Sequence, residues 1–357
     1  MNRLITIIFI IVGLICAAGT SGAQERPSQP LYNVGYRVLD FNYQKDGRAD
    51  VLTVAVWYPT SAQAKPYAYG GSLMGTAAVD AAPLAHGGPF PLLVFSHGYG
   101  GSGLSAVFFT ERLAACGWIV AAPDHHDKYS AARIRTGRLK DFNRRGFWSE
   151  AREIGATGPA ERGRYVYRLD EMKLAIDGMI TSEPFGKIID GKRIAVGGHS
   201  FGGFTALGLC GTIKERCDPR IKAVLLFSTG AGGYLFREDE LTRVRMPSML
   251  YIGEREREQL RGAETMSAIA DKIYRSLHAP KYFLEVKGAN HFSFNNGFSD
   301  DDAARRLSGA PEQFDVIRRY AIAFLEKHAA FRDGGHAVLE RGNAMLTRYL
   351  KEPLPSK

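Results

Sequence analysis

A serine flanked by glycines is the part of this sequence with the clearest chemical meaning. Gly198-His199-Ser200-Phe201-Gly202 fits the pattern G-x-S-x-G, in which a sharp strand-to-helix turn exposes a serine hydroxyl. Residues 193–197 are typical of a short buried strand, and residues 204–209 can open a helix. Glycine at both flanking positions removes the Cβ atoms that would clash in so tight a turn. We therefore predict that Ser200 is a nucleophile.

A serine hydroxyl attacks effectively only when a neighbouring base accepts its proton. His291 lies in Gly288-Ala289-Asn290-His291-Phe292, directly after an expected strand that ends at Val286. The chain order serine, acid, histidine places the base on the loop after the last strand. We predict His291 as this base. Four other histidines are less well placed to act as the base, because they lie inside the turn or on and after expected helices. They are His199, His278, His328 and His336.

The acid that would orient the histidine is expected just beyond the strand at residues 249–252. Glu256 is the first choice there, Glu254 is the alternative, and Asp239 is a further candidate. Such an acid holds the imidazole in one tautomer and stabilises its charged form. The alternating charges of residues 254–258 also fit an exposed loop without a catalytic role.

Two backbone N–H groups must stabilise the negative charge that develops on the attacked carbonyl. The residue after the nucleophile, Phe201, is expected to supply the first. The loop Ser96-His97-Gly98-Tyr99-Gly100-Gly101-Ser102-Gly103 follows an expected strand, and its glycines allow a close approach to substrate. We predict the main chain of Tyr99 as the second donor of this oxyanion hole, with its ring lining the acyl pocket and His97 in a structural role.

One further cluster, Asp124-His125-His126-Asp127, contains residue types that bind metals. Zinc sites need three or four ligands at matched spacing, and no second cluster accompanies this one. A structural role is therefore expected for these residues. The sequence predicts neither a metal nor a cofactor.

The 357 residues are 45% hydrophobic and 23% charged, which suits one large α/β domain. Residues 1–23 have the positive start, apolar run and small residues before Gln24 that are typical of a cleaved signal peptide. An uncleaved membrane anchor is the alternative. We expect a secreted or periplasmic protein with an enzyme domain at residues 24–330 and a polar tail at residues 331–357.

The net charge of +9 is concentrated in a basic insertion or lid, residues 128–165. Residues 128–168 contain eleven Lys or Arg and four acids. This surface can contact an anionic membrane peripherally, or it can be a solvated flap without a partner. No nucleic-acid motif accompanies the charge, and no obligate protein partner is implied.

Cysteine placement suggests one disulfide. Cys210 and Cys217 flank a short polar loop, and an oxidising compartment would allow them to pair. Two unpaired thiols are the alternative. Cys116 lies in an apolar helical run and is expected to be a packed thiol.

Strands and helices are expected to alternate after an antiparallel hairpin formed by residues 36–41 and 51–58. A Gly/Ala/Pro-rich surface loop is predicted at residues 62–89. The later pattern predicts a mostly parallel central sheet with helices on both faces. Its expected strands are 92–95, 118–122, 193–197, 221–227, 249–252 and 282–286, and its expected helices are 106–115, 167–180, 264–277 and 314–327.

The chain resembles the platelet-activating-factor acetylhydrolase branch of the α/β-hydrolase superfamily. The resemblance is carried by Val94-Phe95-Ser96-His97-Gly98, Val120-Ala121-Ala122-Pro123-Asp124-His125 and Gly198-His199-Ser200-Phe201-Gly202-Gly203. Val56-Trp57-Tyr58-Pro59 and residues 288–294 are similar to bacterial members, often called predicted dienelactone hydrolases. The resemblance covers roughly residues 34–330 and implies an α/β-hydrolase fold.

The resemblance also implies a metal-independent serine esterase with Ser200, His291, Tyr99 and Phe201 in the roles given above. The animal enzymes carry their acid directly after the strand that matches residues 221–227, where this chain has Ser228. The expected acid is therefore one strand further along, at Glu256. The nucleophile also differs from the cysteine of dienelactone hydrolases.

The sequence thus predicts hydrolysis of short-acyl or lipid-like esters through an acyl-enzyme. Cutinases and polyester hydrolases are similar in layout, and the same three residue types also cleave amides in amidases and peptidases. A non-catalytic binding protein that retains the fold is the alternative from another class.

Overall fold

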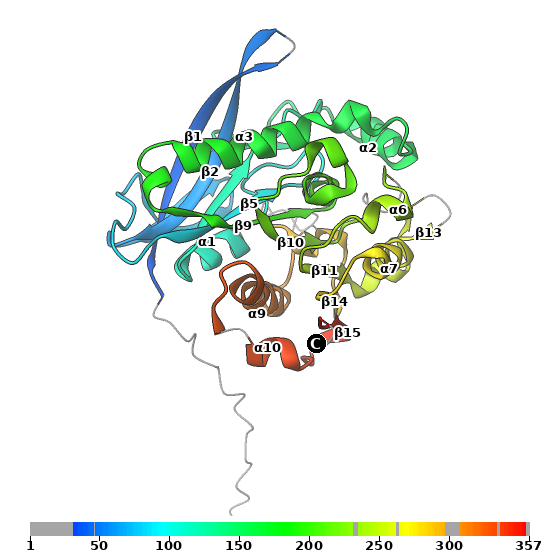
Figure 1. Cartoon of the computed structure of the whole chain (residues 1–357). Coiled ribbons are helices and arrows are strands. Elements are labelled where there is room, and N and C mark those ends of the chain that lie inside the picture. The colour runs from blue at the N-terminus through cyan, green and yellow to red at the C-terminus, as the bar shows by residue number, and fades with distance from the viewer. Residues whose placement is uncertain are drawn as a thin grey trace, which may run out of the picture.

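The computed structural model describes residues 31–45, 47–230, 235–261, 264–296, 308–333 and 336–354. An eleven-stranded sheet forms the centre, in the order β15-β14-β11-β10-β9-β5-β6-β2-β1-β4-β3 (Figure 1). Its middle is parallel, with β9 paired to β5 on one side and to β10 on the other. The parallel strands are β5 (Phe90–Ser96), β6 (Ile119–Pro123), β9 (Ile189–His199), β10 (Ile221–Phe227), β11 (Ser248–Gly253) and β14 (Lys281–Val286).

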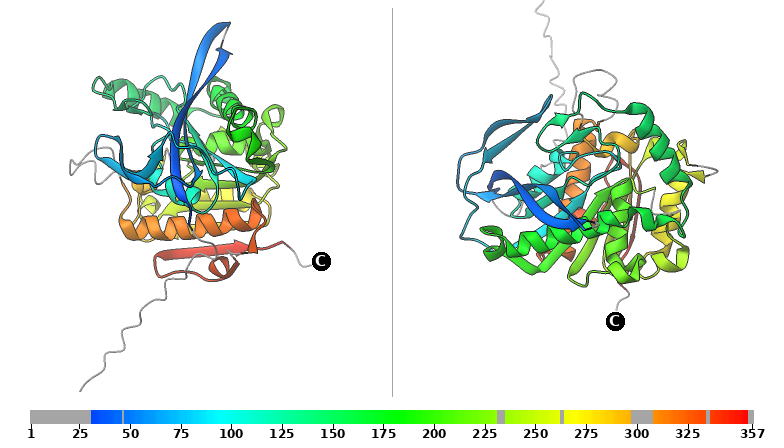
Figure 2. Two further views of the ribbon diagram at one scale, coloured as in Figure 1. Left: turned by 90° about the vertical axis from the view of Figure 1, so that its left-hand side faces the viewer. Right: turned by 90° about the horizontal axis from the view of Figure 1, so that it is seen from above.

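Alternating side chains of the strands build a hydrophobic core on each face of the sheet. Leu92 and Val94 of β5 belong to one core, whereas Leu93 and Phe95 belong to the other. The first core contains α3 (Tyr167–Thr181), α4 (Phe201–Leu207) and α7 (Met266–Ser276), and the second contains α1 (Val107–Ala115) and α9 (Pro311–His328). Figures 1 and 2 show α3 and α9 on opposite sides of the sheet. The predicted α/β sheet with helices on both faces is confirmed.

The expected antiparallel hairpin is present and longer than predicted. It comprises β1 (Asn33–Lys45) and β2 (Arg48–Thr60), which pair along their whole lengths. Only Val54–Trp57 of β2 pair with β6, so the far end of the hairpin projects beyond the body of the molecule (Figure 1).

The segment predicted as a surface loop instead contains two strands, β3 (Lys65–Gly70) and β4 (Leu73–Val79). They form an antiparallel pair, and β4 also pairs with β1. Tyr69 packs against the rings of Tyr36 and Trp57 and accepts a hydrogen bond from the Trp57 indole. This aromatic contact stabilises strands whose Gly/Ala/Pro-rich composition favours a loop.

The expected tail contains further regular structure, α10 (His336–Glu340) and β15 (Leu346–Glu352). Strand β15 pairs antiparallel with β14, so the sheet continues past residue 330. The boundaries proposed for the enzyme domain otherwise stay predictions.

The basic insertion folds over the sheet as short elements around one amphipathic helix. This helix, α2 (Arg144–Ala156), is capped by Asn143, whose side chain accepts from the Gly146 N–H at 2.8 Å. The other elements here are β7 (Ala132–Arg133), β8 (Gly137–Arg138) and η1 (Arg162–Tyr165). Short elements elsewhere are η2 (Phe185–Lys187), η3 (Gly208–Thr212), η4 (Lys214–Arg216), α6 (Glu238–Leu241), η5 (Glu254–Arg257), β12 (Leu260–Arg261), β13 (Glu264–Thr265) and η6 (His291–Phe294).

Two sequence expectations concern export and redox state. The predicted signal peptide lies outside the described residues, among which no helix is long and apolar enough to span a membrane. Cys210 and Cys217 are both free thiols in the structure, as in the alternative to the predicted disulfide; Cys210 is buried in the core and Cys217 is exposed at the end of η4. Burial raises the pKa of the Cys210 thiol well above its usual value, which keeps it protonated.

Candidate active site

Ser200 occupies the sharp turn between β9 and α4 near the middle of the sheet. Its φ of 54° lies in the left-handed region, and its N–H donates to the Phe227 carbonyl at 2.9 Å. A Cβ on Gly198 would lie 2.3 Å from the backbone of Gly202, and a Cβ on Gly202 would lie 2.0 Å from the Ser96 oxygen. Both glycines are therefore required by the close backbone packing of the turn.

The loop after β14 brings His291 to this serine, as the sequence predicts. His291 Nε2 lies 2.8 Å from Ser200 Oγ, across 91 positions of the chain. Asn290 supports this placement, because its side-chain oxygen accepts the Phe292 N–H at 2.8 Å and caps η6. The geometry suits transfer of the serine proton to the imidazole.

The structure distinguishes between the candidate acids. Glu256 is fully buried, with Oε2 at 3.2 Å from His291 Nδ1 and Oε1 accepting the Gly253 N–H at 2.8 Å. Glu254 instead accepts the Gly288 N–H at 2.7 Å, and Asp239 forms surface ion pairs with arginines. Of the three, Glu256 is the one that contacts the histidine.

Ser228, which directly follows β10, joins the same cluster, although the sequence pattern predicts no role for it. Its buried Oγ lies 2.6 Å from Glu256 Oε2 and 2.6 Å from His291 Nδ1. The signal that could have identified it is its position at the carboxyl end of the strand next to the nucleophile strand, where catalytic side chains of such sheets gather.

The loop with Tyr99, the expected oxyanion loop, runs directly beside the nucleophile turn. A Cβ on Gly98 would lie 3.3 Å from Ser200 Cβ. The Tyr99 ring stacks on Phe147 of α2 with centroids 5.4 Å apart, and it makes a T-shaped contact with the Phe201 ring at 6.3 Å. Phe201 begins α4, so its N–H belongs to the unsatisfied donors of a helix start. The predicted donors thus lie on the two segments that meet at Ser200.

A buried ion pair binds the backbone of the oxyanion loop on both sides of Tyr99. Arg168 Nε lies 3.3 Å from Asp127 Oδ1, and both side chains are fully buried. Arg168 donates to the His97 carbonyl at 2.8 Å, while Asp127 accepts the Gly100 N–H at 2.7 Å. These two hydrogen bonds fix the position of the backbone before and after Tyr99. This pair has no recognisable signal in the sequence, because its members lie 41 positions apart in a segment whose many charges are typical of a surface.

The chain is similar to several known proteins. The family model described as platelet-activating factor acetylhydrolase, isoform II, matches residues 47–145, which end before Ser200. A platelet-activating factor acetylhydrolase of Cavia porcellus is 26% identical over 69% of this chain, and the match spans 59% of that enzyme. The same enzyme of Canis lupus familiaris is 26% identical, with 90% of this chain and 81% of the relative covered.

A solved structure, the ferulic acid esterase from Streptomyces cinnamoneus, superimposes with a TM-score of 0.65 at 20% identity. The match covers 91% of this chain and 98% of that one. This chain has the α/β-hydrolase fold. Ser200 lies on the strand-to-helix turn that carries the nucleophile in this fold.

The residues that resemble metal ligands have structural partners within the fold. Asp124 accepts the N–H groups of Gly103 and Ile134, and His125 lies 2.7 Å from Glu171 and 2.8 Å from Ser96 Oγ. In the part of the chain that the structure describes, no three His, Cys, Asp or Glu side chains are grouped so as to hold a metal ion.

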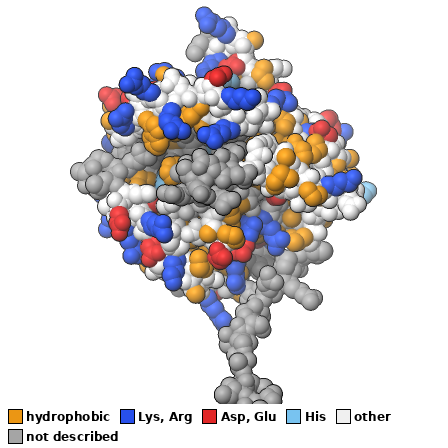
Figure 3. Space-filling model, turned by 180° about the vertical axis from the view of Figure 1, so that it is seen from behind, with side chains coloured by type: hydrophobic (Ala, Val, Ile, Leu, Met, Phe, Trp, Pro, Cys, Tyr) orange, Lys and Arg blue, Asp and Glu red, His pale blue; other side chains and the backbone are white. Residues whose placement is uncertain are grey.

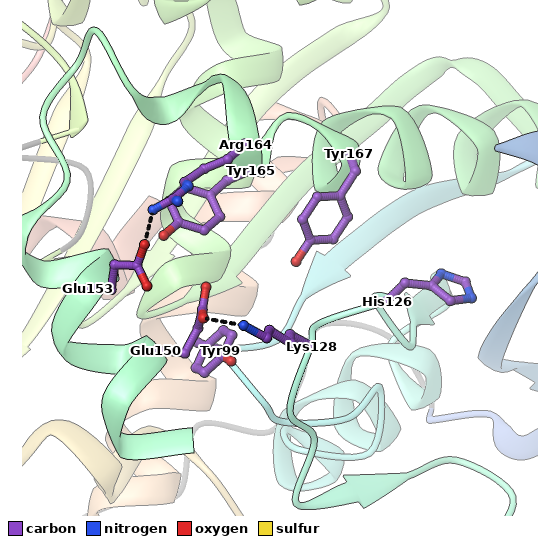
Figure 4. A pocket seen from close by; sticks show the side chains of 8 residues that line it. All are labelled: Tyr99, His126, Lys128, Glu150, Glu153, Arg164, Tyr165 and Tyr167. Atoms are coloured by element: carbon purple, nitrogen blue, oxygen red, sulfur yellow. Dashed lines mark hydrogen bonds and ion pairs between the residues drawn. The ribbon is translucent and has the colours of Figure 1, made fainter. Parts of the chain in front are cut away.

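A cavity of about 240 Å³ lies between the oxyanion loop and the basic insertion (Figure 4). Ion pairs of Arg164 with Glu153 and of Lys128 with Glu150 border it. The Tyr165 ring in its wall also packs edge-on against Phe201, the residue after the nucleophile, at 5.1 Å. Its lining is Tyr99, His126, Lys128, Glu150, Glu153, Arg164, Tyr165 and Tyr167.

Proposed function

We propose that this protein is a serine hydrolase that cleaves carboxylic esters through an acyl-enzyme. The observation that carries the proposal is the chain of contacts from Ser200 Oγ to His291 Nε2 at 2.8 Å and from His291 Nδ1 to Glu256 at 3.2 Å. A hydroxyl, an imidazole and a buried carboxylate in this order form the arrangement that activates a serine. The acetylhydrolase relatives and the esterase fold neighbour support the same reaction class.

In the proposed reaction, Ser200 Oγ bonds to the ester carbonyl carbon while His291 Nε2 accepts the hydroxyl proton. The N–H groups of Tyr99 and Phe201 stabilise the resulting oxyanion. Collapse of this intermediate breaks the bond to the alcohol oxygen, which takes the proton from His291. Water then attacks the acyl-enzyme by the same route, with His291 as base, and releases the acid and free Ser200.

The cavity beside Tyr99 is proposed to receive a non-reacting part of the substrate. Its volume of about 240 Å³ suits a short acyl chain or a compact group better than a long extended chain. Short-acyl and lipid-like esters are therefore the proposed substrate class, with acetyl-phospholipid hydrolysis of the acetylhydrolase type as one member. Cutinase-like polyester hydrolysis, aromatic-ester hydrolysis and amide cleavage are the alternatives within the hydrolases.

Export and membrane contact stay predictions in this proposal. A secreted or periplasmic location depends on the leader sequence. Figure 3 shows Lys and Arg side chains interspersed with acidic and hydrophobic ones on the face seen from behind. Seven of the eleven cations of residues 128–168 bind protein groups: Lys128, Arg133, Arg135, Arg152, Arg162, Arg164 and Arg168. This internal pairing leaves less charge for a lipid surface than the sequence suggests.

The decisive experiment is labelling with a fluorophosphonate probe, followed by hydrolysis of p-nitrophenyl acetate. Wild-type protein should be labelled at Ser200 and should turn the ester over. Ser200→Ala should abolish both while leaving the thermal unfolding midpoint within a few degrees, because it removes only one hydroxyl. Ser61→Ala, at an exposed serine, is the matched control and should behave as wild type.

Unlabelled wild-type protein would favour a non-catalytic binding protein. Labelling together with faster cleavage of a p-nitroanilide than of the ester would favour an amidase. A panel of short-acyl esters, short-chain phospholipids and a polyester film would then rank the ester substrates.

A further inference from the structure

The shortest contact of His291 Nδ1 is to a hydroxyl and not to the acid. Ser228 Oγ lies 2.6 Å from this nitrogen, whereas Glu256 Oε2 lies 3.2 Å from it. The same hydroxyl is 2.6 Å from Glu256 Oε2. Two side chains, those of Ser228 and Glu256, therefore meet behind the imidazole, and both are fully buried.

The positions of the hydrogens follow from the donors and acceptors present. An ionised carboxylate only accepts, so the single hydrogen of the Ser228 hydroxyl is donated to Glu256. The hydroxyl oxygen is then left to accept, and its remaining short partner is His291 Nδ1, which must carry a hydrogen. With Nδ1 protonated, Nε2 of the neutral imidazole is free to accept the proton of Ser200.

We propose that Ser228 is a positioning residue, which links Glu256 to His291 and sets the tautomer of the base. This inference rests on the proposed serine hydrolase function. The hydroxyl passes the orienting effect of the carboxylate to the imidazole through two short hydrogen bonds. In a buried site such charge-assisted bonds are stronger than neutral ones.

The backbone of Ser228 supports this placement. Its φ is 46°, in the left-handed region that non-glycine residues rarely adopt, and its N–H donates to the Tyr251 carbonyl at 2.9 Å. This bond to β11 holds the residue where its side chain points between the acid and the base. Strained conformations of this kind persist where the surrounding structure over-determines them.

A double-mutant cycle separates positioning from a general structural role. Ser228→Ala should lower kcat for p-nitrophenyl acetate by roughly tenfold or more with little change in KM, because it removes a hydrogen bond to a charged group. Glu256→Ala should lower kcat by about a thousandfold or more. Ser228→Ala in the Glu256→Ala background should have no further effect, because the hydroxyl acts through the carboxylate.

Ser248→Ala is the matched control. Ser248 is also buried at the end of a strand, but it is the first residue of β11 and so lies at the edge of the sheet opposite to the site. This variant should retain wild-type kcat. A second test places a carboxylate at position 228. Ser228→Asp in the Glu256→Ala background should raise kcat at least tenfold above Glu256→Ala, whereas Ser228→Asn should not. Aspartate and asparagine both tolerate the left-handed backbone.

The outcomes are distinguishable. A wild-type enzyme without labelling or turnover would remove the proposed function itself. An active wild type with an unchanged kcat in Ser228→Ala, or with additive losses in the cycle, would overturn the positioning role. Thermal unfolding of each variant shows whether it is folded, and the single Ser228→Ala variant alone decides the question if the Asp variant does not fold.

Discussion

At the scale of single residues, the left-handed backbone conformation of Ser200 is possible because Gly198 and Gly202 have no Cβ atom. Gly198 and Gly202 approach each other and the Ser96 carbonyl more closely than any side-chain carbon allows. The turn therefore brings the nucleophile strand, α4 and the oxyanion loop together at one point. The G-x-S-x-G pattern is recognisable in the sequence for this reason, since backbone contact imposes glycine directly.

Gly202→Ala tests this contact. Its Cβ would lie 2.0 Å from the Ser96 oxygen, so the oxyanion loop or α4 must move. We expect a loss of several kcal/mol in the free energy of unfolding and loss of fluorophosphonate labelling. Gly191→Ala is the control, because nothing lies within 4 Å of its Cβ position, and it should change stability by less than about 0.5 kcal/mol. Equal stabilities in urea unfolding would contradict the packing argument.

The sequence predicts Ser200, His291 and Glu256 because each follows a recognisable strand, and chain order assigns the first two. It does not predict Ser228 or the pair of Asp127 and Arg168. Serine after a strand is common, and a charge pair distant in sequence carries no local pattern. These residues become recognisable only when distances in three dimensions are known.

At the scale of elements, the oxyanion loop depends on α3 and on the loop after β6 for its position. Arg168 from α3 holds the His97 carbonyl, and Asp127 holds the Gly100 N–H. Burial and the nearby Arg168 charge lower the pKa of His97 to about 3, so this imidazole is neutral at neutral pH. The loop thus has rigid supports on both sides of its expected N–H donor.

Arg168→Met should therefore affect catalysis as well as stability. Removal of one member of a buried ion pair typically costs about 3–5 kcal/mol of folding free energy. We also expect kcat to fall by about tenfold to a hundredfold, because a displaced oxyanion donor costs about a hundredfold or more. Steady-state kinetics below the unfolding temperature, together with urea unfolding, check both effects.

The matched control is Arg216→Met, which removes a half-exposed ion pair with Asp170 and should have little effect on either measurement. Loss of stability in Arg168→Met with an unchanged kcat would show that the ion pair supports the fold without positioning the loop.

Helices and strands are predictable from the sequence where apolar residues recur with a clear period. They are not predictable where glycine and proline, or many polar residues, hide that period. The parallel strands and α1, α3, α7 and α9 lie where apolar runs predict them. Strands β3 and β4 were missed, because glycine and proline favour a loop and the Tyr69 contacts that stabilise them are tertiary. Strand β15 was missed because its polar sequence gives no buried pattern, and its register comes from pairing with β14.

At the scale of the whole molecule, buried imidazoles couple stability to pH. Burial is the main cause that lowers the pKa of His97 and His199 to about 3 and that of His125 well below its usual value of 6.5. The unfolded chain binds protons at these groups near pH 6.5, while the folded protein does not. Folding stability should therefore be greatest above pH 6.5 and should fall as the pH decreases toward 3.

Each of these histidines contributes a slope of about 1.4 kcal/mol per pH unit in that window. His199→Gln should reduce the slope of unfolding free energy between pH 6 and pH 4.5 by this amount, measured by urea unfolding at each pH. His278→Gln, at an exposed histidine, is the control and should preserve the wild-type slope. An identical slope in His199→Gln would mean that this imidazole is protonated in the folded protein.

One border of the sheet depends on the strand β15, which covers the buried strand β14. Strand β14 is buried along its whole length, and β15 occupies the side that would otherwise present free backbone groups. A chain shortened before residue 346 would expose an apolar strand with unpaired N–H and C=O groups, which is a template for aggregation. Residues 346–352 thus serve as a covering strand for the apolar edge of β14.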